Sequence, residues 1–135
     1  MELEKSLTIS ASGMQAQTTR LTVIAQNLAN QDSTGSTPGA DPYRRKTVSF
    51  TDKMDRALGA ETVVVRSIGK DTAAFPRRFD AANPAADTQG YVKLPNVNAL
   101  VEMADMREAE RSYQANLAVM QTTRGMLSRT IGMLG

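Results

Sequence analysis

The sequence predicts a mainly α-helical protein with a small β part: long N- and C-terminal helices pair as a coiled coil, and a small β-rich domain lies between them. All five prolines fall between residues 38 and 95, and proline is the strongest helix breaker. Both proline-free flanks carry apolar residues seven apart, while the middle has short β-branched runs between turn residues. The predicted division is 1–31 for the N-terminal helix, 32–95 for the loop and β-rich domain, and 96–135 for the C-terminal helix.

The N-terminal helix is predicted from a repeat of seven. Its members are Leu7, Met14, Leu21 and Leu28, and Ile24 fills an adjacent turn. Residues at this spacing line one helical face and suit coiled-coil packing. We therefore expect these five side chains to carry the packing of this helix.

The C-terminal helix shows the same repeat over a longer run. Its members are Met106, Tyr113, Met120, Leu127 and Leu134, with Leu117 and Ile131 three residues before two of them. Asn96 or Asn98, just after Pro95, is expected to cap the start of the helix. Both helices are longer than is usual in globular proteins, which favours a rod-like coil.

The middle of the chain is predicted as short strands joined by loops. Residues 44–50 and 62–68 are rich in alternating or β-branched residues and are expected to be strands. Residues 75–79 contain a proline, which an edge strand tolerates. Residues 52–58 are predicted as a helical turn. So few large apolar groups can build only a small, marginal β unit.

The distribution of charge is the most informative feature of the two flanks. Residues 6–31 contain one charge, Arg20, and residues 112–135 contain only Arg124 and Arg129. A solvated helix normally carries Lys and Glu on its outer face, whereas uncharged polar groups can be buried when hydrogen-bonded. We therefore expect other protein chains to cover most of each helix. A simple intramolecular hairpin and a membrane-surface helix are the alternatives, although the latter needs a basic face that is absent here.

The first turns of the C-terminal helix differ, because charged residues crowd into residues 102–111. Glu102, Asp105 and Glu108 are spaced so that they could approach a cation, but helices that bind metals in this way normally add His ligands. The chain contains no His. We expect this portion to face water or a polar neighbour.

Composition argues against catalysis and cofactor binding. The absence of His and Cys removes the commonest general base, thiol chemistry and the usual zinc sites. A pair of carboxylates for glycoside cleavage would have to come from Asp71, Asp80 and Asp87, which lie in loops without an evident apolar pocket. We expect no enzyme activity, no cofactor and no metal.

Other partners are also weakly supported. The basic clusters at 44–46 and 77–78 are balanced by acidic residues in the same segment, so nucleic acid binding is not expected. No run of 18 apolar residues is present, and the acidic start lacks the features of a cleaved signal. These standard signals predict a cytoplasmic protein unless a dedicated export machine recognises the chain.

Several motifs of the chain nevertheless have known counterparts. Residues 12–14 (SGM) followed by residues 27–30 (NLAN) are similar to the N-terminal signature of one family, the bacterial flagellar rod and hook proteins. Residues 42–46 (PYRRK), residues 90–98 (GYVKLPNVN) and the run from Glu102 to Asn116 resemble its short proximal-rod members. The motifs occur in the family's order and cover nearly the whole chain. One departure is Asn83, which stands where the family often has His.

The resemblance implies a structural subunit of the flagellar basal-body rod without catalytic activity. Such subunits assemble helically into a torque-transmitting shaft whose paired terminal helices line an export channel. The implied partners are further copies, other proximal and distal rod proteins, and the MS ring. Export would proceed through the flagellar type III apparatus without a cleaved signal, which overrides the cytoplasmic expectation and places the protein in the periplasmic rod.

The resemblance also adds residues to the expected contact set. Asn27, Asn30 and Asn116 belong to the helix motifs and are expected to take part in assembly. Tyr43, Arg44, Arg45 and Lys46 are candidates for contacts with other subunits from the middle of the chain. Two other hypotheses stay open: a coiled-coil adaptor for one soluble partner, and a wall-degrading accessory enzyme.

Overall fold

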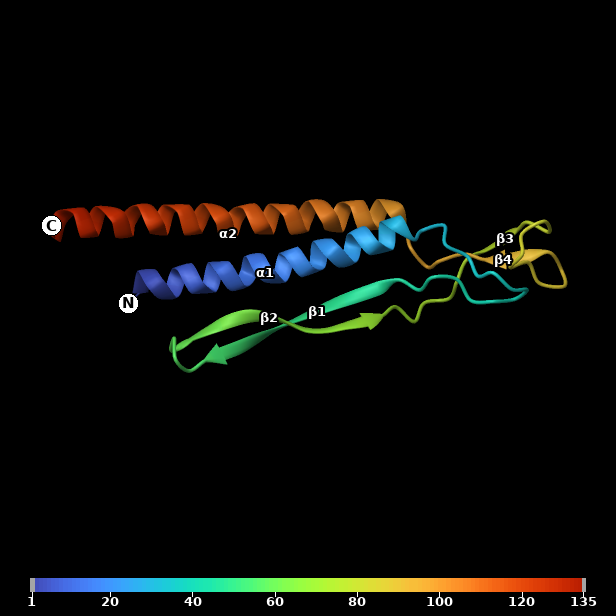
Figure 1. The fold of residues 1–135 in the computed structure, drawn as a ribbon, viewed down its shortest axis with the longest axis horizontal. Helices are drawn as coiled ribbons and strands as arrows, with labels where there is room; N and C mark the ends of the chain where they lie inside the picture. Colours follow the sequence, from blue (N-terminus) through green and yellow to red (C-terminus); the bar gives the residue numbers. More distant parts are fainter. Residues whose placement is uncertain (1, 135) are drawn as a thin grey trace. The chain divides into compact units, whose positions relative to one another are not determined.

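The structure, a computed structural model, describes residues 2–134 and confirms the predicted fold class. Helix α1 spans Glu2–Ala29 and helix α2 spans Ala99–Leu134 (Figure 1). Between them lie strands β1 (Lys46–Asp55), β2 (Ala60–Lys70), β3 (Arg77–Phe79) and β4 (Tyr91–Lys93). The strands form two separate two-stranded sheets, β1–β2 and β3–β4.

The ends of the helices follow the local sequence. The side chain of Asn98 accepts hydrogen bonds from the backbone N–H groups of Leu100 (3.1 Å) and Val101 (3.4 Å), so Asn98 rather than Asn96 is the N-cap of α2. At the end of α1, the Asn30 side chain donates to the Gln26 carbonyl at 2.9 Å. The backbone N–H of Asn30 donates to the same carbonyl at 3.1 Å, so the side chain adds a second hydrogen bond at the last turn of α1.

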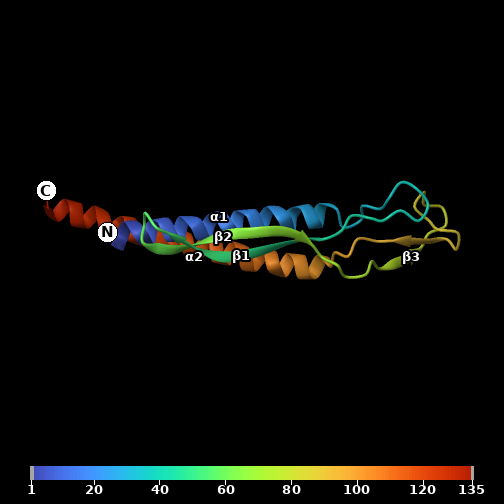
Figure 2. The same ribbon diagram turned by 90° about the horizontal axis from the view of Figure 1, so that it is seen from below.

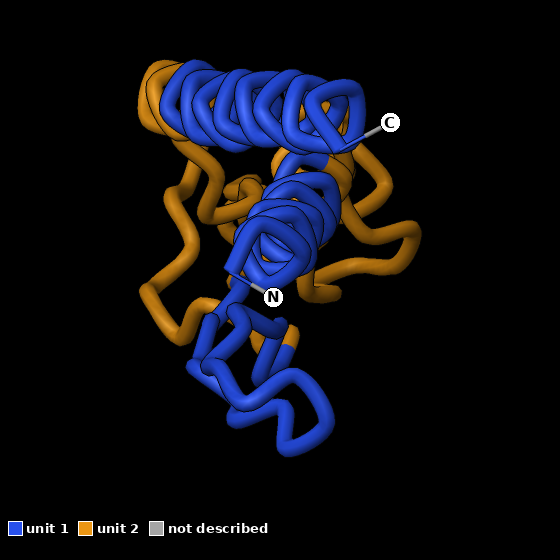
Figure 3. The backbone as a smooth tube through the Cα atoms, turned by 90° about the vertical axis from the view of Figure 1, so that its left-hand side faces the viewer, with its two compact units in different colours: residues 1–21, 48–67, 106–135 blue, residues 22–47, 68–105 orange. Residues whose placement is uncertain are grey.

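The backbone divides into two compact units (Figure 3). The first unit contains α1 up to residue 21, residues 48–67 and α2 from residue 106 onward. The second unit contains residues 22–47 and 68–105. Each unit therefore combines part of both helices with part of the middle of the chain.

In the first unit, α1 and α2 run side by side in opposite directions, and the hairpin of β1 and β2 lies along α1 (Figures 1 and 2). The Ser6 and Thr123 hydroxyls are 3.4 Å apart, and Arg20 forms an ion pair of 3.6 Å with Glu108. The hairpin is tied to α1 by the Val63 N–H, which donates to the Ser12 hydroxyl at 3.3 Å. Packing on a helix gives a two-stranded hairpin the support it needs.

The helical turn predicted at residues 52–58 is wrong, because β1 continues to Asp55. The Asp55 carboxylate accepts hydrogen bonds from the N–H groups of Ala57 and Leu58, both at 3.1 Å. Gly59 closes the turn with a φ of 71°, in the left-handed region that glycine adopts without strain. The side chain of Asp55 therefore makes a hairpin turn from a segment whose composition suited a helix.

In the second unit, β3 and β4 pair antiparallel, with Arg77 opposite Lys93 and Phe79 opposite Tyr91. The two aromatic rings meet edge to face, with centroids 5.5 Å apart. Gly90 precedes β4 with a φ of 85°, and a Cβ there would lie 2.7 Å from the Phe79 ring. The buried apolar residues of this unit are Val23, Ile24, Ala85 and Val92.

Candidate functional site: exposed helix faces and a polar centre

An apolar face on α2 of the first unit is exposed in the single chain. Val119, Met126 and Met133 are spaced by seven residues and are 48%, 51% and 86% exposed. The only charges on α2 after residue 111 are Arg124 and Arg129. A solvated helix face is normally rich in charged residues, and exposed apolar surface of this kind marks sites of interaction. This face is therefore suited to contact with protein.

The seam between α1 and α2 in the first unit is built from small and polar residues. The buried side chains of α1 and α2 in this unit are Ser10, Ala16, Ala109 and Thr123, and Ala16 also lines a depression with Val63, Val64 and Val65 of β2. At Gly13 the helices approach so closely that a Cβ atom would lie 3.0 Å from the Asn116 side chain. Small side chains allow this approach, and the heptad pattern did not identify them.

The large heptad residues flank this seam. Those that are half-buried in the first unit are Leu7, Met14, Leu21, Met106, Tyr113, Asn116, Leu117, Met120 and Leu127. Ile131 and Leu134 are 62% and 85% exposed. Contacts of these residues with neighbouring molecules stay predictions. Because their side chains are only partly buried within the chain, they still have surface that another molecule could cover.

A second exposed apolar surface lies where α2 runs beside the first turns of α1. Leu7, Leu127 and Ile131 line a depression there together with Arg124 and Ser128. Its walls come from both helices of the first unit. The last turns of α2 are thus apolar and exposed at the end of the pair.

In the second unit, Asn27 is the centre of a different arrangement. Its side chain is 1% exposed, donates to the Lys46 carbonyl at 2.9 Å and accepts from the Lys46 N–H at 2.9 Å. The Tyr43 hydroxyl donates to the same Asn27 oxygen at 2.8 Å. Asn27 therefore docks the start of β1 on α1, whereas Leu28 and Asn30 beside it are only half-buried.

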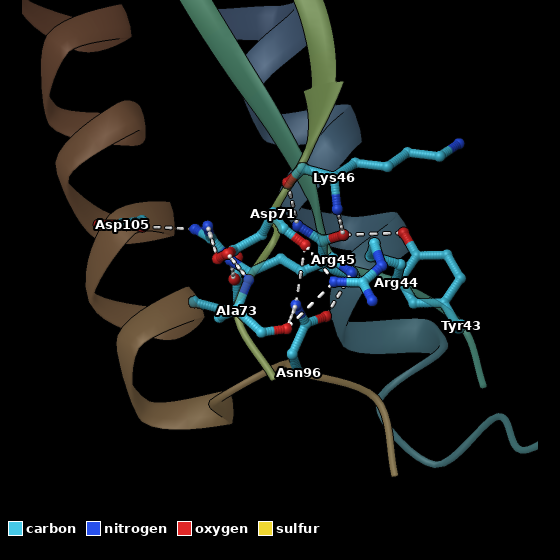
Figure 4. A network of polar contacts seen from close by, with 10 residues as sticks. Tyr43, Arg44, Arg45, Lys46, Asp71, Ala73, Asn96 and Asp105 are labelled. Carbon is cyan, nitrogen blue, oxygen red and sulfur yellow. Dashed lines mark hydrogen bonds and ion pairs between the residues drawn. The ribbon is translucent and has the colours of Figure 1, made fainter. Parts of the chain in front are cut away.

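Arg45 joins three carboxylates (Figure 4). Its Nε donates to Glu102, and its terminal nitrogens lie 3.4 Å from Asp71 and 3.7 Å from Asp105. Its backbone N–H donates to the Asn96 side chain at 2.8 Å. The guanidinium thus connects α2 with the segment that follows β2.

Glu102 shows which half of the expectation, water or a polar neighbour, holds at the start of α2. Its side chain is fully buried, and its Oε2 atom has no hydrogen-bond partner among the described residues. Burying a carboxylate costs less when a cation compensates its charge, and Arg45 provides that cation. Glu102 therefore faces a polar neighbour and not water, whereas Glu108 is 68% exposed.

Contacts and burial in this centre raise the pKa values of Arg45 and Tyr43, which keeps both groups in the form that they normally have at neutral pH. The hydrogen bond with Glu102 is the main cause that raises the pKa of Arg45, the Asp71 carboxylate adds to it, and burial opposes it. Burial, and to a lesser degree the Glu102 charge, raises the pKa of Tyr43 above its usual value. The centre therefore holds a permanent cation and a neutral phenol at neutral pH.

Arg44 lies on the other side of the chain from Arg45. Its Nη1 donates to the carbonyls of Asp71 (2.7 Å) and Ala73 (3.1 Å), and its guanidinium carbon is 4.1 Å from the centre of the Phe75 ring. Asn96 donates to the same two carbonyls. Tyr43, Arg44, Arg45 and Lys46 are thus all held by contacts within the chain, and contacts of theirs with another subunit stay a prediction.

Two of the three carboxylates considered for catalysis, Asp71 and Asp87, have structural partners. Asp71 pairs with Arg45 and accepts from the Ala73 N–H, while Asp87 accepts from the N–H groups of Gln89 and Tyr91. Among the described residues there is no group of three His, Cys, Asp or Glu side chains placed to hold a metal ion. Neither described helix is long and apolar enough to cross a bilayer.

Known proteins match the chain along nearly its whole length. The family described as "Flagella basal body rod protein" matches residues 7–35, and the C-terminal family of the flagellar basal body rod FlgEFG proteins matches residues 88–133. The flagellar basal-body rod protein FlgC of Agrobacterium fabrum is 55% identical over 93% of this chain and 91% of its own. The FlgC proteins of Salmonella typhimurium and Bacillus subtilis are 41% and 37% identical, with at least 93% of both chains covered.

Proposed function

The chain belongs to the FlgC family of flagellar basal-body rod proteins, and we propose from this how its surfaces build the rod. It is a structural subunit of the flagellar basal body rather than an enzyme. In the proposal, copies of the chain associate helically with one another and with other rod proteins. The terminal helices form the continuous contact between subunits and the inner wall of the export channel.

The exposed face of α2 is the observation that carries this proposal. Val119, Met126 and Met133 lie exposed on a helix that has only two charges after residue 111. Burying such a face against protein leaves no unpaired charge, and its Ser, Thr and Gln residues can hydrogen-bond across an interface. A channel wall with few charges also holds a passing polypeptide weakly.

Further parts of the proposal rest on the family alone. The chain leaves the cytoplasm through the flagellar type III apparatus without cleavage of its N-terminus, resides in the periplasmic part of the basal body, and meets the MS ring. Presence of the uncleaved chain in purified basal bodies would support these statements.

A pair of variants at Met126 tests the role of the exposed face. Met126→Glu places a charge on it, and burying an unpaired charge costs several kcal/mol, which is enough to prevent stable association. Met126→Gln has nearly the same length without the charge and is expected to assemble, because uncharged polar residues are common on this helix.

The readout is incorporation into basal bodies and swimming of cells that carry only the variant. Loss with Glu and retention with Gln is the expected result. Normal incorporation of both variants would show that the face stays in solvent and refute the proposal. An adaptor for one soluble partner is distinguished by sedimentation, since it would give a discrete complex instead of rods.

A further inference from the structure

A groove in the second unit is lined mainly by cations. It has a volume of about 410 Å³, and its charged lining residues are Arg44, Lys46, Lys70 and Asp41. Pro42, Tyr43 and Phe75 complete its walls. The Asp41 carboxylate is already paired with Lys93, at 3.0 Å. Three cations therefore line the groove, and the charge of Asp41, the one acidic residue among its lining residues, is compensated by Lys93, which lies outside the lining.

Arg44 is held in a fixed position at this groove. Two backbone carbonyls accept hydrogen bonds from its Nη1, and the Phe75 ring covers one face of the guanidinium. A guanidinium has five N–H donors, and Nη1 supplies two of them. The hydrogen bonds of Nη1 leave the Nε and Nη2 edge of the guanidinium available for another acceptor. This edge has the geometry that binds a carboxylate through two parallel hydrogen bonds.

The two lysines keep their charge available. Lys46 donates to the neutral side chain of Gln26 at 3.2 Å, and Lys70 is exposed at the end of β2. Neither forms an ion pair among the contacts of the described chain. Because Arg44 is already ordered, a carboxylate that binds beside it loses less conformational entropy than it would with a flexible cation.

We propose that this groove is a docking site for an acidic segment of a neighbouring protein subunit. One carboxylate binds the open edge of Arg44, further acidic groups lie against Lys46 and Lys70, and apolar parts of the segment rest on Phe75. Arginine and aromatic residues together are typical of the centres of protein interfaces, which favours a protein segment over another anion. The inference rests on the role of the chain as a rod subunit.

Carbodiimide cross-linking of purified basal bodies tests this site in the native assembly. The reagent joins a lysine amine and a touching carboxylate by an amide bond, with loss of water, and mass spectrometry identifies the two peptides. The pair Lys93–Asp41 serves as an internal control, because its side chains are in contact within one chain. We expect Lys46 or Lys70 to be joined to an Asp or Glu of another subunit.

Each other outcome has a definite meaning. If the control pair is joined while Lys46 and Lys70 are not, or are joined only within their own chain, the docking site is refuted. If the mass of the adduct on either lysine corresponds to a cell-wall peptide, the partner of the groove is the anionic cell-wall polymer, and the proposed protein segment is refuted. If the chain is missing from the basal bodies, the role as a rod subunit fails instead.

A double variant, Lys46→Gln with Lys70→Gln, tests the same site without cross-linking. It removes two charges and leaves the contacts of Arg44 in place. The matched control is Lys53→Gln with Arg66→Gln, which removes two exposed cations of the β1–β2 hairpin. The double variant should wash out of basal bodies at a lower salt concentration than the control, since attraction between charges at an interface is screened by salt. Identical release of both variants would contradict the proposal.

Discussion

Removal of the Arg45 guanidinium is expected to destabilise the second unit strongly. The variant Arg45→Met keeps an unbranched side chain but leaves the fully buried Glu102 without the cation that it contacts. Breaking a buried ion pair by deleting one partner typically costs about 3–5 kcal/mol, because the remaining charge is buried and uncompensated. We expect a loss of this size in the free energy of unfolding.

The reverse deletion should cost less. In Glu102→Leu, the guanidinium of Arg45 keeps Asp71 at 3.4 Å and Asp105 at 3.7 Å, and its side chain is 23% exposed to water. We expect a loss of about 1–3 kcal/mol, the usual cost of a lost charged hydrogen bond. The double variant Arg45→Met with Glu102→Leu removes both members of the pair and leaves no uncompensated charge. Its loss in the free energy of unfolding should therefore be smaller than the sum of the two single losses.

Urea unfolding followed by far-ultraviolet circular dichroism measures these free energies. Arg66→Met serves as the control, since Arg66 is an exposed cation on β2, and its change should stay within about 0.5 kcal/mol. Losses that simply add in the double variant, or an Arg45→Met variant as stable as the control, would show that Glu102 does not depend on Arg45. Either result would refute the account of this centre.

Two further predictions concern backbone and protonation. Gly125→Ala should raise the melting temperature of the protein, because nothing lies within 4 Å of the added Cβ and alanine is favoured over glycine in helices by about 1 kcal/mol. Gly13→Ala should give no such gain, because its added Cβ would lie 3.0 Å from the Asn116 side chain. An equal rise in melting temperature for both variants would show that Gly13 is not in close contact with α2. Hydrogen bonds from the N–H groups of Tyr91 and Gln89, with the nearby Arg77 charge, outweigh desolvation and lower the pKa of the Asp87 carboxyl. A group with a lowered folded pKa stabilises the fold above its unfolded value of about 3.9, and this contribution is lost as the pH falls through the folded pKa; an NMR titration of Asp87 with a midpoint at or above 3.9 would refute the assignment.

Much of the fold could be predicted from the sequence because its signals are local. The confinement of proline to residues 38–95 separates the helices from the middle, and the observed helices begin and end within about three residues of the predicted bounds. Asn98 caps α2, as one of two candidates. The strands predicted at 44–50, 62–68 and 75–79 overlap β1, β2 and β3, because alternation and β-branched runs are local features, although Pro76 lies just before β3.

What the sequence did not predict depends on contacts between distant residues. Glu102 appeared solvated because its helical neighbours are charged, yet its partner Arg45 lies 57 positions away. The heptad rule selects large apolar residues, whereas at Gly13 an added Cβ would lie only 3.0 Å from the Asn116 side chain of α2. A glycine within a helical pattern costs stability, and only the nearby Asn116 side chain explains why it is there.

The contrast between the two kinds of helix surface explains how one small chain can fold and still assemble. In the second unit, the polar side chains of Asn27, Arg45 and Glu102 are buried and partnered within the chain, so this region fixes its structure without help from a neighbour. In the first unit, α2 exposes Met126 and Met133 with few charges nearby. The free energy of burying this apolar surface is therefore gained only when another protein covers it. A subunit built in this way gains stability on incorporation, which favours growth at the end of an existing rod over persistence as a free monomer.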